Sequence, residues 1–230
     1  MKRIDAFMLI IVILAAATAC DTKFDYHLSR SIFIPDQDNP GLPIYSEKGY
    51  NSFGVYWGLK PFTSQSNEES SQVIVWGDSC HINFYGLADS STRMVATRTS
   101  DSDIHQAGLF YYGETGYAAH TLTFTIPDFK PNAFGDLLSL NNKKYNLKED
   151  KCVVSLMAGS DSLHVEILEG EFYIKKAQNL YVDNVLTRVV LSGTFSFKAL
   201  LNDMPTSFLN GRFDMGYGDE NFFLLQKKTP

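Results

Sequence analysis

SGTFSF at residues 192–197 is echoed by NGRFDM at residues 210–215. In both runs the apolar side chains recur at every second residue, which places them on one face of a strand. Asn202-Asp203-Met204-Pro205 lies between the runs and is typical of a turn, so we expect an antiparallel hairpin. The side chains that this hairpin would bury are Phe195, Phe197, Phe213 and Met215. Gly193 and Gly211 would permit a bulge or a bend in the paired strands.

Short runs with the same β pattern continue toward the N-terminus and are separated by turn signals. HTLTFTI at residues 120–126 alternates most cleanly, with threonines on one face and Leu, Phe and Ile on the other. VIVW at residues 73–76 and INFY at residues 82–85 flank a Gly-Asp-Ser turn and predict a second hairpin. Further strands are expected at residues 53–57, 92–98, 109–112, 152–157, 163–168, 171–175 and 221–226.

These strands predict an all-β fold, because only residues 136–138 carry a helical signal, and that signal is short. Antiparallel strands with one apolar and one polar face are typical of a β-sandwich or, alternatively, of a partly open β-barrel. No unit of 20–50 residues recurs along the chain, so the pattern does not favour a solenoid or a propeller.

The N-terminus has the pattern of an export signal. Lys2 and Arg3 give it a positive start, and residues 6–17 contain no charged side chain. That apolar run is shorter than the roughly 20 residues of a membrane-spanning helix, whereas it fits the apolar region of a signal peptide.

Ala17-Thr18-Ala19-Cys20 resembles the lipobox of bacterial lipoproteins, in which small residues precede the cysteine that receives the lipid. Lipoboxes usually carry Leu where this chain has Ala17. The alternative is ordinary secretion with cleavage after Ala19, since Ala17-Thr18-Ala19 is also an A-x-A pattern. We therefore expect residues 1–19 to be a signal peptide, residues 20–33 a lipidated tether, and residues 34–230 a single β-sandwich-like domain.

The charge of the chain argues against one class of partner. Cleavage before Cys20 would remove Lys2, Arg3 and Asp5, and the formal charge would change from −6 to −7. Nucleic-acid binding requires clustered Lys and Arg, and this chain shows no such cluster, since pairs such as 143–144 and 175–176 are isolated. We therefore expect no nucleic-acid partner.

Two further stretches resemble known sequences. Gly41–Gly54 (GLPIYSEKGYNSFG) resembles the opening of exported lipoproteins of gut Bacteroidota, and SGTFSF…NGRFD resembles the closing hairpin of uncharacterised lipoproteins from the same group. With the lipobox, these segments cover about a quarter of the chain. The resemblance implies a lipid-anchored β-sandwich of unestablished function and carries over no catalytic residue.

The two remaining cysteines and the histidines are candidates for structural or metal-binding roles. Cys80 and Cys152 would form either a disulfide in an oxidising compartment or two separate buried thiols. The five histidines have no HxxxH or HExxH spacing, so we expect no metal and no cofactor. Residues 36–41 (DQDNPG) have the acidic spacing of a calcium loop, but they lack its final Glu and are more typical of a solvated turn.

Catalysis is not the favoured interpretation. Residues 158–162 lack the GxSxG nucleophile elbow, and no pattern fixes a distance between the carboxylates that a glycosidase would need. The acidic residues considered for that role are Asp101, Asp103, Glu166, Glu169 and Glu171.

Aromatic residues make up 13% of the chain, and they serve either the core or a ligand-binding surface. Those considered for ligand contact are Tyr50, Tyr56, Trp57, Trp76, Tyr111 and Tyr112. The overall prediction is a non-catalytic lipoprotein of the cell envelope, held at the outer membrane by its lipid, which binds or scaffolds a glycan or protein partner. The alternatives are a nutrient-capture module that binds carbohydrate or peptide, a fimbrial subunit and a hydrolase. The sequence leaves the oligomeric state open.

Overall fold

The computed structural model describes residues 31–64, 70–88, 120–158 and 161–225, and their fold is all-β and largely antiparallel, as predicted. The strands are β1 (Ser52–Trp57), β2 (Lys60–Thr63), β3 (Ser71–Trp76), β4 (Ser79–Ala88), β5 (His120–Pro127), β6 (Lys143–Asn146), β7 (Val153–Ala158), β8 (Asp161–Leu163), β9 (Val165–Val182), β10 (Val185–Leu201), β11 (Met204–Tyr217) and β12 (Phe222–Leu225). In the described ranges the single helix is the 3₁₀ helix η2 (Phe134–Leu140), at the predicted position.

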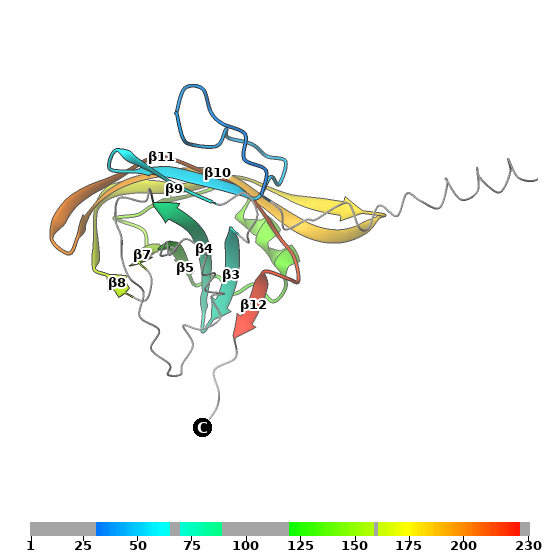
Figure 1. The fold of residues 1–230 in the computed structure, drawn as a ribbon. Coiled ribbons are helices and arrows are strands. Elements are labelled where there is room, and N and C mark those ends of the chain that lie inside the picture. The colour runs from blue at the N-terminus through cyan, green and yellow to red at the C-terminus, as the bar shows by residue number, and fades with distance from the viewer. Residues whose placement is uncertain (1–30, 65–69, 89–119, 159–160, 226–230) are drawn as a thin grey trace, which may run out of the picture.

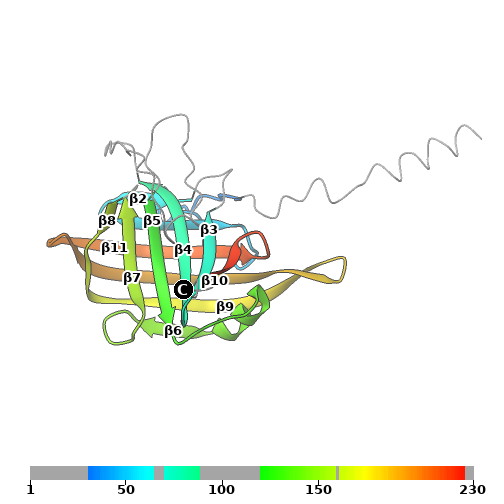
Figure 2. The same ribbon diagram turned by 90° about the horizontal axis from the view of Figure 1, so that it is seen from below.

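Two strand layers form the body of the fold (Figures 1 and 2). One layer has the order β6-β9-β10-β11-β1-β2, and its three long strands arch over the other layer. The other layer has the order β12-β3-β4-β5-β7-β8, and Figure 2 shows its strands crossing the long strands steeply. A short pairing of β2 with β4 joins the layers at one corner. The sheet does not close into a barrel, and the fold is sandwich-like.

The predicted hairpins are confirmed. β10 pairs with β11 so that Phe195 lies opposite Gly211 and Gly193 opposite Phe213. β3 pairs with β4 across the Gly77-Asp78 turn. Of the strands expected at residues 163–168 and 171–175, Leu163 ends β8, and the rest from Val165 onward run together in β9, because a bulge rather than a turn separates them.

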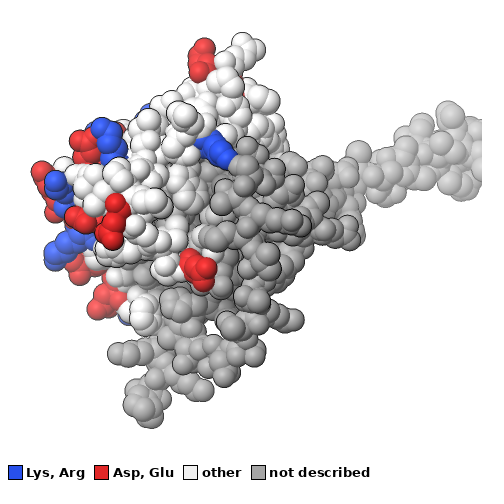
Figure 3. All heavy atoms as spheres, turned by 60° about the vertical axis from the view of Figure 1, so that its left-hand side comes forward, with Lys and Arg blue, Asp and Glu red and all other residues white. Residues whose placement is uncertain are grey.

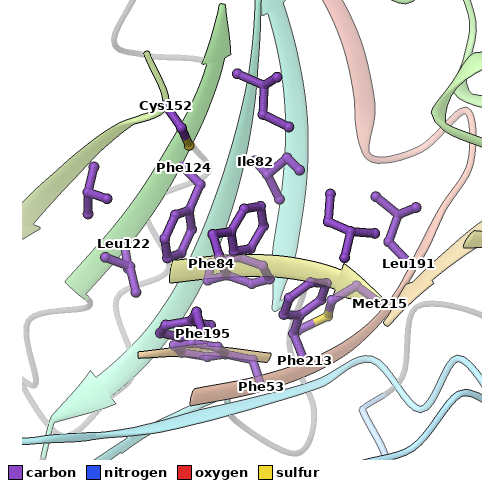
Figure 4. Close-up of a cluster of buried hydrophobic side chains, with 14 of the residues drawn as sticks. Phe53, Ile82, Phe84, Leu122, Phe124, Cys152, Leu191, Phe195, Phe213 and Met215 are labelled. Carbon is purple, nitrogen blue, oxygen red and sulfur yellow. The ribbon is translucent and has the colours of Figure 1, made fainter. Parts of the chain in front are cut away.

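Phenylalanine rings fill the space between the layers (Figure 4). Phe195 and Phe213 are each 2% exposed, as the alternating pattern requires. Gly211 makes room for these rings, because a Cβ atom there would lie 2.5 Å from the Phe195 ring. The other two predicted core residues, Phe197 and Met215, are also buried.

The first described residues lie on the other side of the long layer, where Figure 1 shows them in blue away from β3, β4 and β5. The amide of Ile32 donates to the Tyr50 carbonyl at 2.7 Å, and Ser31 is 5% exposed. Residues 31–33, which were expected to end the tether, are therefore part of the fold.

The strands expected at residues 92–98 and 109–112 lie outside the described residues. In the described part of the chain, no helix has the length and apolar character that a membrane crossing requires.

Candidate functional site

The outer face of β10 and β11 holds a buried carboxylate. Asp214 alternates with the core residues Phe213 and Met215, so it faces away from the core, yet it is only 1% exposed. Three successive amides, those of Lys48, Gly49 and Tyr50, donate to its oxygens at 2.9–3.1 Å. Such a row of N–H groups is a nest that suits an anion. The Ser192 hydroxyl donates a fourth bond at 2.8 Å.

A second contact holds the first described segment, residues 31–51, farther along the outer face of β10 and β11. The Arg212 guanidinium pairs with the Asp36 carboxylate, and both side chains are largely buried. Asp36 also accepts bonds from the Asn39 side chain and the Asp38 amide, both at 2.9 Å. Hydrogen bonds from Asn39 and Asp38, together with Arg212, hold the pKa of Asp36 below its ordinary value. The calcium-like DQDNPG stretch is thus a turn whose first carboxylate binds an arginine.

Beyond the segment that covers Asp214, two bulges shape the outer face. In β9, Ile167 lies opposite Ala199 and Glu169 opposite Lys198, so Leu168 is an extra residue. In β11, Phe208 pairs with Phe197 of β10 and Gly211 pairs with Phe195. Residues 209 and 210 of β11 therefore lie opposite the single residue 196 of β10 and form the second bulge. Both bulges lie against residues 196–198 of β10. Bulges occur often near binding sites because they redirect side chains.

Between the bulges lies a groove of about 510 Å³, which is within the usual size of small-molecule sites. Gly170 lies at its base, where a Cβ atom would lie 2.3 Å from that of Phe197, so only glycine fits there. Leu168 and Leu209 give it apolar walls and are 37% and 40% exposed. The groove is lined by Asn146, Lys148, Glu149, Leu168, Glu169, Gly170, Glu171, Ser196, Phe197, Lys198 and Leu209.

Charges of both signs surround the groove. Lys198 pairs with Glu169 at 2.7 Å and Lys144 with Glu171 at 2.7 Å. The bond from Lys198 lowers the pKa of Glu169, whereas a glycosidase acid requires a raised pKa. Figure 3 shows acidic and basic side chains gathered together at one side of the molecule, beside a surface that carries few charges. The groove can therefore offer donors, acceptors and apolar contact at once.

The described aromatic candidates do not form one platform. Trp57 faces the core, where its ring lies 5.5 Å from that of Phe208. Tyr56 donates to the Pro40 carbonyl at 2.9 Å, and Tyr50 lies under the ammonium group of Lys48. Trp76 is 41% exposed but belongs to β3, in the other layer.

Cys80 and Cys152, for which a disulfide was one of two alternatives, are not bonded. Cys80 lies opposite Ile126 in β5, and the β5–β7 register places Cys152 on the far side of Ile126. Two strand spacings are about 10 Å, which exceeds the Cα separation that a disulfide can bridge. Both cysteines are free and buried, and burial raises the pKa of each thiol to about 12. They are therefore packing residues, the other alternative that the sequence left open.

Other sequence candidates fall outside the described ranges, namely Cys20, Tyr111 and Tyr112. Among described residues, no group of three or more metal-ligating side chains gathers. Comparisons of the chain with protein-family models, curated proteins and solved structures found no match.

The sequence does not predict the groove, although Glu169 and Glu171 were among the candidates for a glycosidase carboxylate pair and both line it. Two signals pointed toward it. Gly170 lies between the two β-patterned runs 163–168 and 171–175, and Asn210-Gly211 is the kind of pair that adopts positive φ, as Asn210 does at 56°. Neither signal predicts which strands lie side by side at the bulges, so neither predicts the groove.

Proposed function

We propose that this chain is an exported lipoprotein of the bacterial cell envelope, whose β-domain acts by binding rather than by catalysis. The observation that carries the proposal is the run of small residues before Cys20, preceded by an apolar stretch and a positive start. Acyl chains on Cys20 would hold the domain at a membrane, at about 0.8 kcal/mol per buried CH₂. We propose that the lipid anchor lies in the outer membrane.

The anchor is tested by replacing its sulfur. Cys20→Ser should move the protein from the membrane fraction to the soluble fraction of the producing cell, because no thioether to lipid can form. Thr22→Ser is the matched control, since it alters a hydroxyl residue two positions later and leaves the thiol in place. A Cys20→Ser protein that still sediments with membranes would contradict the proposal.

The groove favours a glycan as the ligand. Sugars present hydroxyl groups together with apolar C–H faces, and the groove presents charged and amide side chains beside Leu168 and Leu209. Pairing of Glu169 and Glu171 with lysines favours the role of hydrogen-bond acceptors over that of hydrolytic acids. A domain that binds sugar at the cell surface would support nutrient capture.

A glycan array on the native domain tests this ligand class. Lys198→Glu should abolish the signals of the native protein, because it sets two carboxylates against each other at the groove. Lys151→Glu is the matched control, since Lys151 also lies near a carboxylate, that of Asp128 at 3.7 Å, but outside the groove. Equal signals from both variants, or no signal from the native domain, would exclude the groove as a glycan site.

Assembly into a surface fibre is the second candidate function. The strand β12 is four residues long, lies at an edge of its layer and pairs with β3 in parallel. An edge strand of this kind can be exchanged between copies. A synthetic peptide spanning residues 218–230 should then bind to a chain truncated after Gly218, and failure to bind would contradict strand exchange.

A further inference from the structure

The hairpin of β9 and β10 extends beyond the rest of the described chain, and exposed apolar side chains flank the Asp183-Asn184 turn at its tip. Figures 1 and 2 both show it, in yellow, running past the two layers. Asp183 and Asn184 have φ values of 51° and 62°, which is the signature of a type I′ turn. Around this turn, Tyr181, Val182 and Val185 are 58%, 38% and 64% exposed.

The apolar side chains occupy both faces of the tip. Val182 pairs with Val185, and Tyr181 pairs with Leu186 one step back. Because side chains alternate along a strand, the valines face one side and Tyr181 and Leu186 face the other. Leu186 approaches Gly135 of η2, so Tyr181 is the exposed apolar residue of its face. A folded protein partner would cover one face of a two-stranded ribbon, whereas a bilayer surface surrounds both.

The composition of the tip suits the interfacial zone of a bilayer. Tyrosine is enriched there, because its ring is apolar and its hydroxyl remains hydrated. No Lys or Arg lies within residues 180–187, so electrostatic attraction to anionic lipid is not the driving force. The surface that this tip fits is zwitterionic.

The first described residues lie near the base of the same hairpin. A side chain at Gly49 would meet Val190 of β10, and the neighbouring Tyr50 carbonyl accepts the amide of Ile32. Val190 is five residues from Val185, or about 17 Å along the strand. Cys20 precedes Ser31 by eleven residues, a span of at most about 40 Å. Lipid on Cys20 and the hairpin tip can therefore reach one bilayer.

We propose that the tip formed by residues 180–186 inserts into the interfacial zone of the zwitterionic bilayer that holds the lipid anchor. The proposal rests on the anchor proposed above. Insertion provides a second attachment point and fixes the orientation of the domain, so that the groove keeps one direction relative to the membrane.

The test couples the chain beginning at Cys20, which retains every described residue, to phosphatidylcholine vesicles through a maleimide lipid. Cys80 and Cys152 are buried, so Cys20 reacts selectively. Tyr181→Trp should show blue-shifted emission on the vesicles and stronger quenching when the acyl chains are brominated, after subtraction of the signal of native tethered protein. Met204→Trp is the matched control, since Met204 is 67% exposed beside a turn at the other end of β10.

Equal quenching of the two tryptophans would overturn the proposal. A blue shift at position 181 that also occurs without vesicles, and grows with protein concentration, would overturn it in favour of self-association. Because the tether is chemical, the result does not depend on acylation by the cell. The lack of natural acylation on Cys20 would be seen separately, in the mass of the native N-terminus.

Discussion

The two faces of the β10–β11 hairpin are built from alternate residues of the same two strands and are stabilised by different interactions. Its inner face presents Phe195 and Phe213 to a core of stacked rings, where shape and exclusion of water are sufficient. Its outer face presents Ser192, Arg212 and Asp214, which are buried or largely buried beneath the N-terminal segment. A polar group buried there must find partners, because leaving it unpaired is costly.

This difference shows why alternation predicts one face better than the other. A period of two identifies which side chains point inward, and the inner face needs nothing further. The three amides that bind Asp214 lie 164–166 residues away in the sequence, and no local pattern predicts this contact. The outer network also holds Tyr50, whose carbonyl accepts the amide of Ile32 at the start of the described chain.

The largest effect should come from the inner face. Phe213→Ala removes a ring that lies 5.2 Å from Phe84 and 5.5 Å from Phe172, and it should lower the free energy of unfolding by about 3–5 kcal/mol. Urea unfolding measures this loss. A loss below about 1 kcal/mol would mean that the ring cluster is loosely packed.

A smaller but still large effect is expected at Asp214. Asp214→Asn keeps the side-chain shape but removes the charge and replaces one acceptor oxygen with an NH2 donor that faces other donors, at a cost of about 3 kcal/mol. Ser192→Ala removes one of the four bonds and should cost about 1 kcal/mol. Hydrogen exchange should quicken at Lys48–Tyr50 in the Asp214 variant before it does in the core. Unchanged exchange there would contradict the anchoring role of the carboxylate.

The Asp36–Arg212 pair should give a pH-dependent effect of intermediate size. Because the folded state lowers the pKa of Asp36 below its ordinary value of 3.8, the pair stabilises the fold above that pH and less as pH falls through the lowered value. The difference in unfolding free energy between native and Asp36→Asn proteins should thus be constant near neutrality and shrink below about pH 4. A difference that grows on acidification would contradict the assignment.

The smallest effect is expected at the groove. Lys198 and Glu169 are 57% and 66% exposed, and exposed ion pairs contribute little to stability. Lys198→Ala should therefore leave the midpoint of urea unfolding unchanged within error, while it weakens the binding of any ligand in the groove. A clear shift of the midpoint would show that the pair is structural.

The sequence predicted the all-β class, the two main hairpins and the core residues because each depends on local alternation. It did not predict the length of β9, because the bulge at Leu168 interrupts alternation in the way that a turn does. The strand register keeps Cys80 and Cys152 too far apart for a disulfide, because they share a face but are separated by Ile126. The groove depends on two bulges meeting β10 from opposite sides, and that arrangement belongs to the sheet and not to any segment.

The most direct test of the account is the mass of the N-terminal peptide of native protein purified from membranes with detergent. The account predicts a chain that begins at Cys20 and carries the added mass of a diacylglyceryl group on its sulfur. A chain that begins at Met1, or a Cys20 thiol without added mass, would contradict it.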